Sequence, residues 1–358
     1  MRRIENEPVP VLKALLKPAA AVYEVLTSAR NLAFECGWRK VFDPGVPVVS
    51  IGNLTAGGTG KTPVTALLAN GLRSRGYAVG IVSRGFGGRE KGPVRVSATG
   101  DTEAAAKFGD EPAWLAARFP DIPVYVGADR VAAVQALKRE NRVDLVIADD
   151  AFQHRRLARH FDVVILDALE PEWHYRLLPL GRLRESFSSL KRADSVFITK
   201  ANLASLEERE RLRKRIDAVF AETGEPPPIF EIESALSGFT KLGGSTDEVI
   251  PARGLAGKKV LLASGIGRPE SFERLMLQEA DAQIVDHVVF ADHHRYSKAD
   301  LEKISARVRE KGAELLVVTE KDAVKMTGWS PEFPCWVTKL EARGSLDGFY
   351  EVLHRRLF

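Results

Sequence analysis

Cysteine is scarce in this sequence, with only Cys36 and Cys335 among 358 residues. Two cysteines argue against a disulfide framework and against a metal site built from clustered thiolates. Long apolar runs are also missing, because no uninterrupted stretch reaches the roughly 18 residues of a membrane-spanning helix. The N-terminal residues show neither the apolar core nor the small-residue cleavage site of a signal peptide. We therefore expect a protein of a reducing cytosol without a spanning helix.

Composition and charge narrow the class further. Hydrophobic residues make up 45% and charged residues 28%, which is typical of a soluble globular protein with a sizeable core. The net charge is +4 and the pI is about 9.0. This mildly basic balance suits anionic small molecules, phospholipid surfaces or nucleic acid, and it chooses among none of them. The length favours two domains.

The strongest motif lies at residues 46–62, VPVVSIGNLTAGGTGKT. Its apolar start is typical of a buried parallel strand, a glycine-rich loop follows, and the segment after the loop reads as a helix start. This order places backbone N–H groups and a positive helix end around one anion. In such a loop the lysine reaches the β- and γ-phosphates of a nucleotide, and the following hydroxyl can bind Mg²⁺. The predicted nucleotide-binding residues are Thr55, Ala56, Gly57, Gly58, Thr59, Gly60, Lys61 and Thr62.

Two positions depart from known versions of this motif. Thr55 stands where the pattern G-x-x-x-x-G-K-[ST] has its first glycine. Ala56 stands where the GGxGKT variant of a large ATPase class usually carries lysine. A glycine-rich turn that binds nothing is the alternative, and the order of strand, loop, Gly-Lys-Thr and helix argues against it.

Short apolar runs and helical stretches, one of them at 103–118, alternate after this motif. The alternation predicts a mostly parallel sheet with helices on both faces. A polar, proline-rich segment at 222–228 marks a boundary, and a second α/β series follows it. Residues 229–232 and 336–339 bracket that series and are expected to pair as a two-stranded connection. The predicted fold is therefore α/β, with a P-loop domain at 1–225, a smaller α/β domain at 226–340, and a C-terminal helix at 341–358 that returns to the first domain.

Carboxylates end a later apolar strand, at Asp149 and Asp150. In P-loop enzymes a strand-end aspartate holds Mg²⁺ directly or through water, whereas the alternative is a helix N-cap or a loop acid. Gln153 follows at the same sheet edge, where ligands bind in open α/β sheets. Asp110, in the stretch 108–112, is either the N-cap of a helix or the carboxylate that accepts a substrate proton in a kinase.

Arginines that suit phosphate recognition lie in two loops, Arg84 in one and Arg184, beside Glu185, in the other. Each arginine alone is equally compatible with a solvated surface charge. Adjacent histidines, His293 and His294, come later in the chain. They suggest a metal site, but neighbours on a strand point to opposite faces, and no further Cys or His cluster is near. An Asp-His pair that orients another group is the better interpretation of this stretch.

The N-terminal segment carries apolar residues at helical spacing, namely Leu12, Leu15, Leu16, Ala19, Val22, Tyr23 and Leu26. Basic residues are interspersed or follow, namely Lys13, Lys17, Arg30, Arg39 and Lys40. Pro18 lies inside the run, where it either kinks the helix or divides it. Such a helix is compatible with two roles that do not exclude each other, lying on a membrane surface or packing on its own domain.

Together these motifs resemble one family, the tetraacyldisaccharide 4'-kinase of the lipid A pathway in Gram-negative bacteria. The resemblance is carried by GNLTAGGTGKTP (52–63), SRGFG (83–87), GDEP (109–112), DDAFQH (149–154), LRES (183–186), FADHHRY (290–296) and TEKDAVK (319–325). The P-loop alone is generic, but the ordered set is specific and runs from the N-terminal helix to past residue 325. Thr55 belongs to the family's pattern.

The resemblance implies a kinase that moves the γ-phosphoryl group of ATP to the 4'-hydroxyl of an acylated glucosamine disaccharide 1-phosphate. Two α/β domains would close around its site. Lys61 would stabilise charge on the phosphates, Asp110 would be the base, and His293 would support it. The implied Mg²⁺ ligands are Thr62, Asp149, Asp150 and, as a weaker candidate, Glu185. The implied substrate-binding residues are Arg84, Arg130, Gln153 and Arg184.

The resemblance also implies a peripheral protein at the cytoplasmic face of the inner membrane, acting without nucleic acid or an obligate protein partner. Two other functions stay open from the residues alone. A regulatory or partner-loading P-loop ATPase accounts for the GGxGKT core, but not for Asp292 and His293. A non-catalytic nucleotide-binding module leaves the acids at 110, 149 and 150 without a task. A requirement of ATP consumption for a lipid disaccharide acceptor would separate the kinase from the ATPase.

Overall fold

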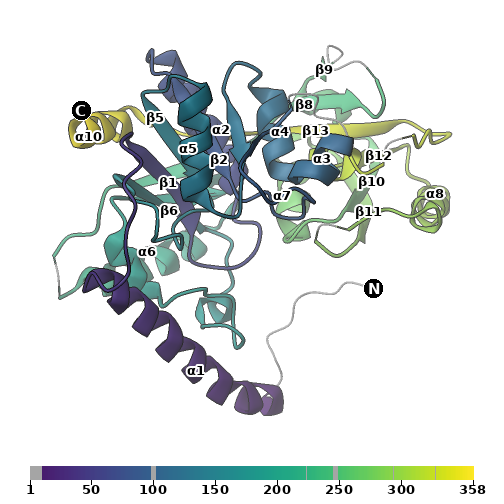
Figure 1. The fold of residues 1–358 in the computed structure, drawn as a ribbon. Coiled ribbons are helices and arrows are strands. Elements are labelled where there is room, and N and C mark those ends of the chain that lie inside the picture. Colours follow the sequence, from purple (N-terminus) through teal and green to yellow (C-terminus); the bar gives the residue numbers. More distant parts are fainter. Residues whose placement is uncertain (1–9, 98–101, 223, 245–248, 293, 327) are drawn as a thin grey trace. The chain divides into compact units, whose positions relative to one another are not determined.

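The computed structural model describes residues 10–97, 102–222, 224–244, 249–292, 294–326 and 328–358. These residues form two compact units, a larger one that runs to Ile232 and resumes at Gly344, and a smaller one of residues 233–343 (Figure 1). The proline-rich stretch predicts the boundary at residue 225. The structure places it after Ile232, because the strand β8 (Ile229–Lys241) passes from the larger unit into the smaller one.

The larger unit is built on a sheet whose strands run in the order β8, β7, β6, β1, β5, β2, β4, β3. Neighbouring strands are parallel, except that β3 is antiparallel to β4. Because β1 lies between β5 and β6, the glycine-rich loop leaves the sheet at its centre. The strand bounds are β1 (Val48–Asn53), β2 (Val79–Ser83), β3 (Val94–Arg95), β4 (Val124–Val126), β5 (Leu145–Asp149), β6 (Phe161–Asp167) and β7 (Ser195–Thr199).

Helices cover both faces of this sheet. On one face the strands pack against α5 and α6, in cores that include Leu137 and Ile216. On the other face Phe349 of α10 packs edge-on against Phe161 and Phe197, with ring centroids 5.7 and 5.0 Å apart. The predicted α/β fold with a mostly parallel sheet is therefore confirmed. The helices are α1 (Pro10–Glu35), α2 (Lys61–Ser74), α3 (Thr102–Phe108), α4 (Asp110–Arg118), α5 (Arg130–Glu140), α6 (Leu206–Phe220) and α10 (Asp347–Leu357), with 3-10 turns at Glu172–Tyr175, Phe187–Arg192 and Ala201–Leu203.

The smaller unit has its own sheet, in the order β11, β10, β12, β13, β8, with β9 paired to β8. Residues 336–343 of β13 pair antiparallel with residues 233–241 of β8. The predicted two-stranded connection is therefore confirmed, but its predicted residue pairing is not, because residues 336–339 pair with 238–241, while residues 229–232 pair with β7 of the larger unit. The other elements are β9 (Val249–Ile250), β10 (Lys259–Ser264), β11 (Gln283–Val289), β12 (Leu315–Val318), α7 (Pro269–Glu279), α8 (Lys298–Lys311) and α9 (Glu320–Ala323), with a 3-10 turn at Ala252–Leu255.

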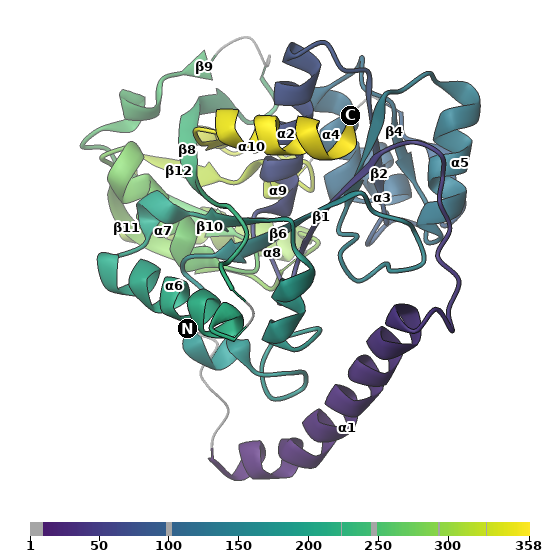
Figure 2. The same cartoon turned by 90° about the vertical axis from the view of Figure 1, so that its left-hand side faces the viewer.

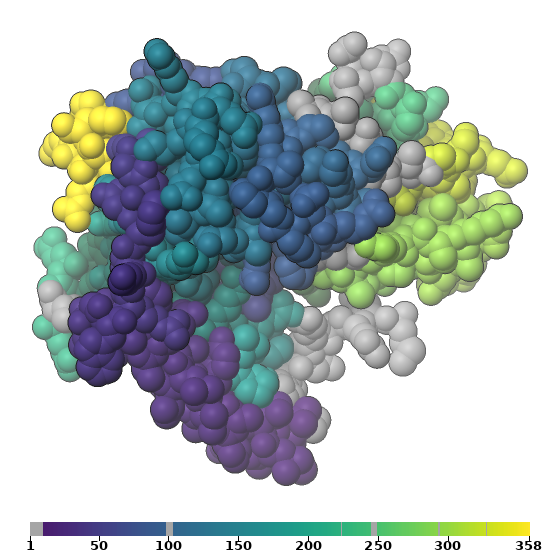
Figure 3. Space-filling view, in the orientation of Figure 1, coloured from purple at the N-terminus to yellow at the C-terminus, as the bar shows by residue number. Residues whose placement is uncertain are grey.

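The N-terminal helix α1 is a single helix, so Pro18 does not divide it. Figures 1 and 2 show it as a long rod, and in Figure 3 its side chains form a ridge on the face shown. Leu15 is 71% exposed and Leu26 is 64% exposed. Leu16 and Tyr23, predicted on the same stripe, are only half-exposed. None of the described helices is long and apolar enough to cross a membrane.

Candidate functional site

Lys61 is the first residue of α2 and is almost completely buried beyond the carboxyl end of β1. Its ammonium lies 3.3 Å from the side-chain oxygen of Asn53 and 3.6 Å from a carboxylate oxygen of Asp150. Gly60 has a φ of 84° and Gly57 a φ of 119°, conformations that L side chains rarely adopt. The loop thus combines a sharply turned backbone, a helix N-terminus and a cation, which are the parts of an anion site.

A second stretch of chain, residues 182–184, is paired with the first half of this loop. The N–H of Ala56 donates to the carbonyl of Arg182 at 2.7 Å. The N–H of Arg184 donates to the carbonyl of Leu54 at 2.8 Å. The position of the loop therefore depends on a segment more than a hundred residues later in the chain.

Two further contacts fix the tip of the loop. The hydroxyl of Thr199, at the end of β7, donates to the carbonyl of Thr59 at 2.8 Å. The guanidinium of Arg182 passes so close to Gly57 that a Cβ there would lie 2.8 Å from it. The loop is held both from β7 and from the stretch 182–184, so contacts within the protein itself fix its conformation.

The two aspartates at the end of β5 face different partners. Asp149 is fully buried and accepts hydrogen bonds from the hydroxyls of Thr65 at 3.0 Å and Ser83 at 3.2 Å. Asp150 has a positive φ of 50°, rare for a residue with a side chain, and its carboxylate lies 2.9 Å from the guanidinium of Arg184. One carboxylate is therefore locked into the core of the unit, and the other faces the cations of the loop region.

The pKa values of these two carboxyls move in opposite directions. Burial raises the pKa of Asp149 to about 7, and the nearby charges of Glu111 and Asp150 add to the rise. Burial also works to raise the pKa of Asp150, but Lys61 and Arg184 outweigh it and lower that pKa below its ordinary value. Asp150 is thus a fixed negative charge, while Asp149 takes up a proton near neutral pH.

Asp110 is the first residue of α4, because the helix predicted at 103–118 breaks at Gly109 into α3 and α4. Gly109 has a φ of 101° and is itself the N-cap, so the interpretation of Asp110 as an N-cap is wrong. The loop after β2 touches this break closely, since a Cβ on Gly88 would lie 2.7 Å from the backbone nitrogen of Gly109. The charge of Glu111 reaches the buried carboxyl at the end of β5, so the start of α4 lies near that strand end.

The polar residues predicted to bind the substrate lie at different depths. Arg84 is exposed on the loop after β2, and Arg184 is partly exposed beside Asp150. Arg130 is 3% exposed, and its guanidinium donates to the backbone carbonyl of Asp150 at 3.4 Å. The amide of Gln153 donates to the last carbonyl of β1 at 2.9 Å. Arg84 and Arg184 stay proposed contacts of an anionic substrate, whereas Arg130 and Gln153 are engaged in supporting the ends of β5 and β1.

Glu185, predicted as an Mg²⁺ ligand, is a buried carboxylate that holds parts of the protein together. Its fully buried carboxylate accepts hydrogen bonds from Arg30 at 3.0 Å, Asn31 at 2.8 Å, Ser189 at 3.1 Å and Arg192 at 2.7 Å. Burial works to raise the pKa of Glu185, but Arg192, Asn31 and Arg30 outweigh it and lower the pKa. Because these donors occupy the oxygens that a metal would need, the prediction of Glu185 as an Mg²⁺ ligand is not carried further.

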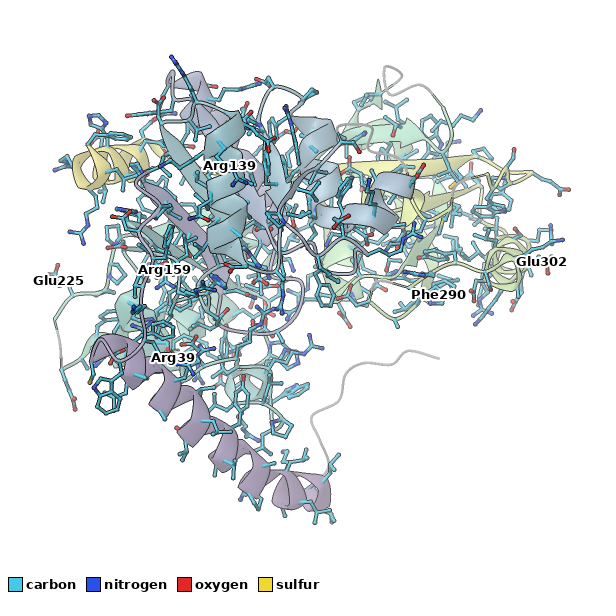
Figure 4. All side chains as sticks on the ribbon, viewed as in Figure 1. Arg39, Arg139, Arg159, Glu225, Phe290 and Glu302 are labelled. Carbon is cyan, nitrogen blue, oxygen red and sulfur yellow. The ribbon has the colours of Figure 1, made fainter. Side chains whose placement is uncertain are left out.

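The stretch 290–296 belongs to the smaller unit, where it follows β11 (Figure 4 labels Phe290 at its start). Asp292 is exposed. His293 lies outside the described residues, so its role as a helper of the base stays a prediction.

The remaining donor set suits Mg²⁺. Thr62 and the aspartates at the end of β5 offer hydroxyl and carboxylate oxygens, which are the hard ligands that Mg²⁺ prefers. The raised pKa of Asp149 fits as well, because a cation would relieve the repulsion from Glu111 and Asp150. In the part of the chain that the structure describes, no cluster of three or more His, Cys, Asp or Glu side chains could bind a metal. Mg²⁺ commonly uses one or two carboxylates together with substrate phosphates.

Sequence reasoning missed the polar residues that hold the site together in the larger unit. Asn53 bonds Lys61, while Thr65 and Ser83 bond Asp149. Their positions carried a usable signal, because two of them end strands and Thr65 lies one helical turn after Lys61 on the same face of α2.

A buried carboxylate in the smaller unit was also missed. Asp322 accepts the hydroxyl of Tyr296 at 2.9 Å and the N–H of Gly265 at 3.1 Å, so it joins the loop after β10 to the stretch 290–296. Its signal was its place in the motif TEKDAVK.

The same unit contains a row of serine, histidine and glutamate, in which Ser264 and Glu273 each lie 2.8 Å from His287. Ser264 is fully buried, so the row connects β10, β11 and α7 and offers no nucleophile to solvent.

Comparison with known proteins points in one direction. A family model described as tetraacyldisaccharide-1-P 4'-kinase matches residues 12–357. A tetraacyldisaccharide 4'-kinase of Bdellovibrio bacteriovorus is 36% identical over 335 residues, which cover 93% of this chain and 96% of that protein. One from Syntrophus aciditrophicus is 37% identical over 340 residues, covering 91% of this chain and 88% of that protein. A crystal structure of LpxK from Aquifex aeolicus in complex with ATP is 25% identical, has a TM-score of 0.73, and covers 97% of this chain and 100% of that chain.

Proposed function

This chain belongs to the tetraacyldisaccharide-1-P 4'-kinase family, and we propose that it transfers the γ-phosphoryl group of ATP to the 4'-hydroxyl of an acylated glucosamine disaccharide 1-phosphate. The members of this family are phosphotransferases of lipid A biosynthesis. The observation that carries the proposal is the buried ammonium of Lys61 at a helix N-terminus, balanced by Asp150 and bordered by the P-loop backbone.

Phosphoryl transfer needs positioning and charge stabilisation more than covalent chemistry. Lys61 supplies a point charge for the β- and γ-phosphates, and the N–H groups of residues 55–62 supply dipoles that are already oriented. Asp150 lies 3.6 Å from the ammonium and balances its charge. Incoming phosphates replace this partner, so the lysine does not have to be withdrawn from bulk water.

Asp110 is the proposed base. It accepts the proton of the 4'-hydroxyl while the oxygen of that hydroxyl bonds to the γ-phosphorus, the bond to the β–γ bridging oxygen breaks, and ADP leaves. Its position in the first turn of α4 places it at the positive N-terminal end of a helix. His293 remains the predicted helper of this base.

Thr62, with Asp149 and Asp150, would hold Mg²⁺. The bound ion supplies a Lewis acid that neutralises charge on the transferred phosphoryl group. Asp149 would serve as a ligand in its ionised form, which a bound cation favours because it offsets the repulsion from Glu111 and Asp150.

The acceptor is a lipid, so the protein has to work at a membrane surface. The exposed apolar side chains of α1 support peripheral binding to the cytoplasmic face of the inner membrane. Arg39 is also exposed and lies just beyond the C-terminal end of this helix, where it can meet anionic headgroups (Figure 4).

A transfer assay with radiolabelled ATP tests the proposal directly. The full-length protein is incubated with labelled ATP and Mg²⁺ in mixed micelles, with and without the tetraacylated disaccharide 1-phosphate. We expect labelled lipid only when the acceptor is present. Release of inorganic phosphate at the same rate with and without the acceptor would favour a regulatory P-loop ATPase instead.

A matched acceptor sharpens the result. A disaccharide whose 4'-hydroxyl is replaced by hydrogen cannot receive the phosphoryl group, and it should bind without forming labelled lipid. Transfer to this analogue would contradict the assignment of the 4'-hydroxyl.

A further inference from the structure

The two sides of α1 have different surroundings. One side carries exposed apolar residues at helical spacing, namely Val11, Leu15, Val22, Val25 and Leu26. The other side includes Ala20, the one residue of α1 that is buried, together with Tyr23 and Asn31. Contacts with the remainder of the larger unit are therefore made by a side of the helix that the apolar stripe does not occupy.

The side of α1 that faces the larger unit contacts the backbone of Arg184 and the side chain of Glu185. The hydroxyl of Tyr23 donates to the backbone carbonyl of Arg184 at 2.9 Å. Arg30 and Asn31 donate to the carboxylate of Glu185 at 3.0 and 2.8 Å. These contacts join parts of the chain that are more than 150 residues apart.

The same stretch is bonded, on its other side, to the nucleotide loop. The N–H of Arg184 donates to the carbonyl of Leu54, and its guanidinium reaches Asp150 at 2.9 Å. Asp150 in turn lies 3.6 Å from the ammonium of Lys61. A chain of direct polar contacts therefore leads from α1 to the lysine of the loop.

The buried carboxylate of Glu185 ties α1 firmly to the stretch 184–185. Two of its hydrogen-bond donors, Arg30 and Asn31, come from α1, and the other two, Ser189 and Arg192, come from the turn that follows. A buried carboxylate that loses partners is far more costly than a broken surface ion pair. If α1 moves away, the stretch 184–185 has to relax as well.

We propose that Tyr23, Arg30 and Asn31 are positioning residues, which fix Arg184 and the nucleotide-binding loop through the stretch 182–185. The seating of α1 on this stretch then sets the rate of phosphoryl transfer. The effect on kcat rests on the proposed function, because it requires the disaccharide to be the acceptor. The effect on nucleotide affinity rests only on the contacts described above. Because the apolar stripe faces away from these contacts, substitutions can separate membrane binding from positioning.

The experiment uses the full-length protein with Tyr23→Phe and Arg30→Met, each of which removes the contact and keeps most of the side-chain volume. Thr27→Val is the matched control, because the hydroxyl of Thr27 bonds only carbonyls of α1 itself. Three quantities are measured for each variant, namely kcat with the tetraacylated acceptor, the dissociation constant of a fluorescent ATP analogue with Mg²⁺, and binding to anionic phospholipid vesicles.

We expect Tyr23→Phe and Arg30→Met each to lower kcat by about threefold to tenfold, the equivalent of one lost hydrogen bond. The dissociation constant of the ATP analogue should rise, while vesicle binding and all properties of Thr27→Val stay at the parent level. Arg30→Lys keeps the cation and should recover most of the loss. In an Arg184→Ala background, Tyr23→Phe should cost less than it does in the parent, because the contact of the Arg184 guanidinium with Asp150 is gone and only the backbone bonds of residue 184 still carry the effect.

Parent-level kcat and nucleotide affinity in folded Tyr23→Phe and Arg30→Met proteins would overturn the proposal. So would losses that multiply fully in the Arg184→Ala background, because the guanidinium of Arg184 would then carry none of the effect of Tyr23. If the parent transfers no phosphate to the disaccharide, the proposed function fails by itself. In that case, the dissociation constant of the ATP analogue still tests the coupling between α1 and the nucleotide-binding loop. It is compared among the parent, Tyr23→Phe, Arg184→Ala and the double variant.

Discussion

At the residue scale, the charge of Lys61 is balanced by a carboxylate of the protein itself. Asp150 lies 3.6 Å from the ammonium, and Arg184 lies 2.9 Å from the same carboxylate. The arrangement keeps a nearly buried cation satisfied and leaves it close to where phosphates bind. It also gives Asp150 a structural reason to stay ionised.

Lys61→Ala removes this cation from a site where phosphate charge develops. We expect kcat to fall on the order of 10²-fold or more, comparable to the loss of one preorganised donor. The measurement is acceptor-dependent transfer at saturating ATP. Lys214→Ala, on the exposed side of α6, is the matched control for loss of one positive charge. Near-normal turnover by a folded Lys61→Ala protein would refute the assignment of the P-loop.

Asp149 gives the protein a pH-dependent stability. Its folded-state pKa of about 7 lies above that of an unfolded chain, so the folded state binds the extra proton between about pH 4 and pH 7. The free energy of unfolding contributed by this group therefore falls as pH rises through that window, by at most about 1.4 kcal/mol per pH unit. Above about pH 7, the stabilising contribution of protonated Asp149 to the folded state is lost.

Asp149→Asn should remove this part of the pH dependence. Denaturant unfolding of parent and variant, without nucleotide or metal, measures it at several pH values across the window. The difference between the two proteins should favour the parent at low pH and shrink as pH rises. Two parallel curves would show that Asp149 has an ordinary pKa.

The sequence predicted some of these residues and not others, for a physical reason. The P-loop residues and the acids at 149 and 150 follow from local order, because strand, loop and helix are adjacent in the chain. Asp149 faces the core and Asp150 faces Lys61 and Arg184. This difference depends on the direction of each side chain, which the positive φ of Asp150 sets. Glu185 was misassigned because its partners, Arg30 and Asn31, are more than 150 residues away.

At the element scale, α1 is the helix whose surroundings matter most. Leu15→Ser together with Leu26→Ser removes two exposed apolar side chains and leaves the inward contacts intact. We expect weaker binding to anionic vesicles and a higher apparent KM for the lipid acceptor, with an unchanged affinity for ATP. Vesicle sedimentation and initial-rate kinetics measure the two effects.

The matched control is a double serine substitution at exposed residues elsewhere, Val249 and Leu277. These lie in the smaller unit, outside α1. If the α1 variant binds vesicles as well as the parent does, α1 is only a packing element of its own unit, and the peripheral-membrane proposal fails.

The types of most elements were predictable, because apolar periodicity reports the buried face of a helix or strand. Two errors show the limit of that signal. The break at Gly109 needs a positive φ, which a helix-like pattern of neighbouring residues hides. The pairing of residues 229–232 depends on which strand lies beside them, and periodicity carries no information on partners.

At the scale of the whole molecule, the predicted base and its predicted helper come from different stretches, GDEP and FADHHRY. Asp110→Asn should keep ATP binding and lower transfer by roughly 10²–10⁴-fold, because it removes the proton acceptor. His293→Ala should lower turnover as well. The double variant should lose less than the product of the two single losses, since groups that act as a unit are not additive.

Single-turnover transfer and ATP-analogue binding measure this cycle. Glu111→Gln, next to Asp110 on α4, serves as a comparison for loss of one carboxylate at the same helix start. Losses that multiply fully in the double variant would mean that Asp110 and His293 act independently.

The chain order of the two units has a consequence for synthesis. The ribosome completes the larger unit's sheet at Ile232, but α10, which covers one face of that sheet with Phe349, comes only after residues 233–343. At usual elongation rates the interval is on the order of ten seconds. During that time Phe161 and Phe197 lack the ring that later shields them. This apolar face of the nascent chain is therefore open to aggregation while the second unit is being translated.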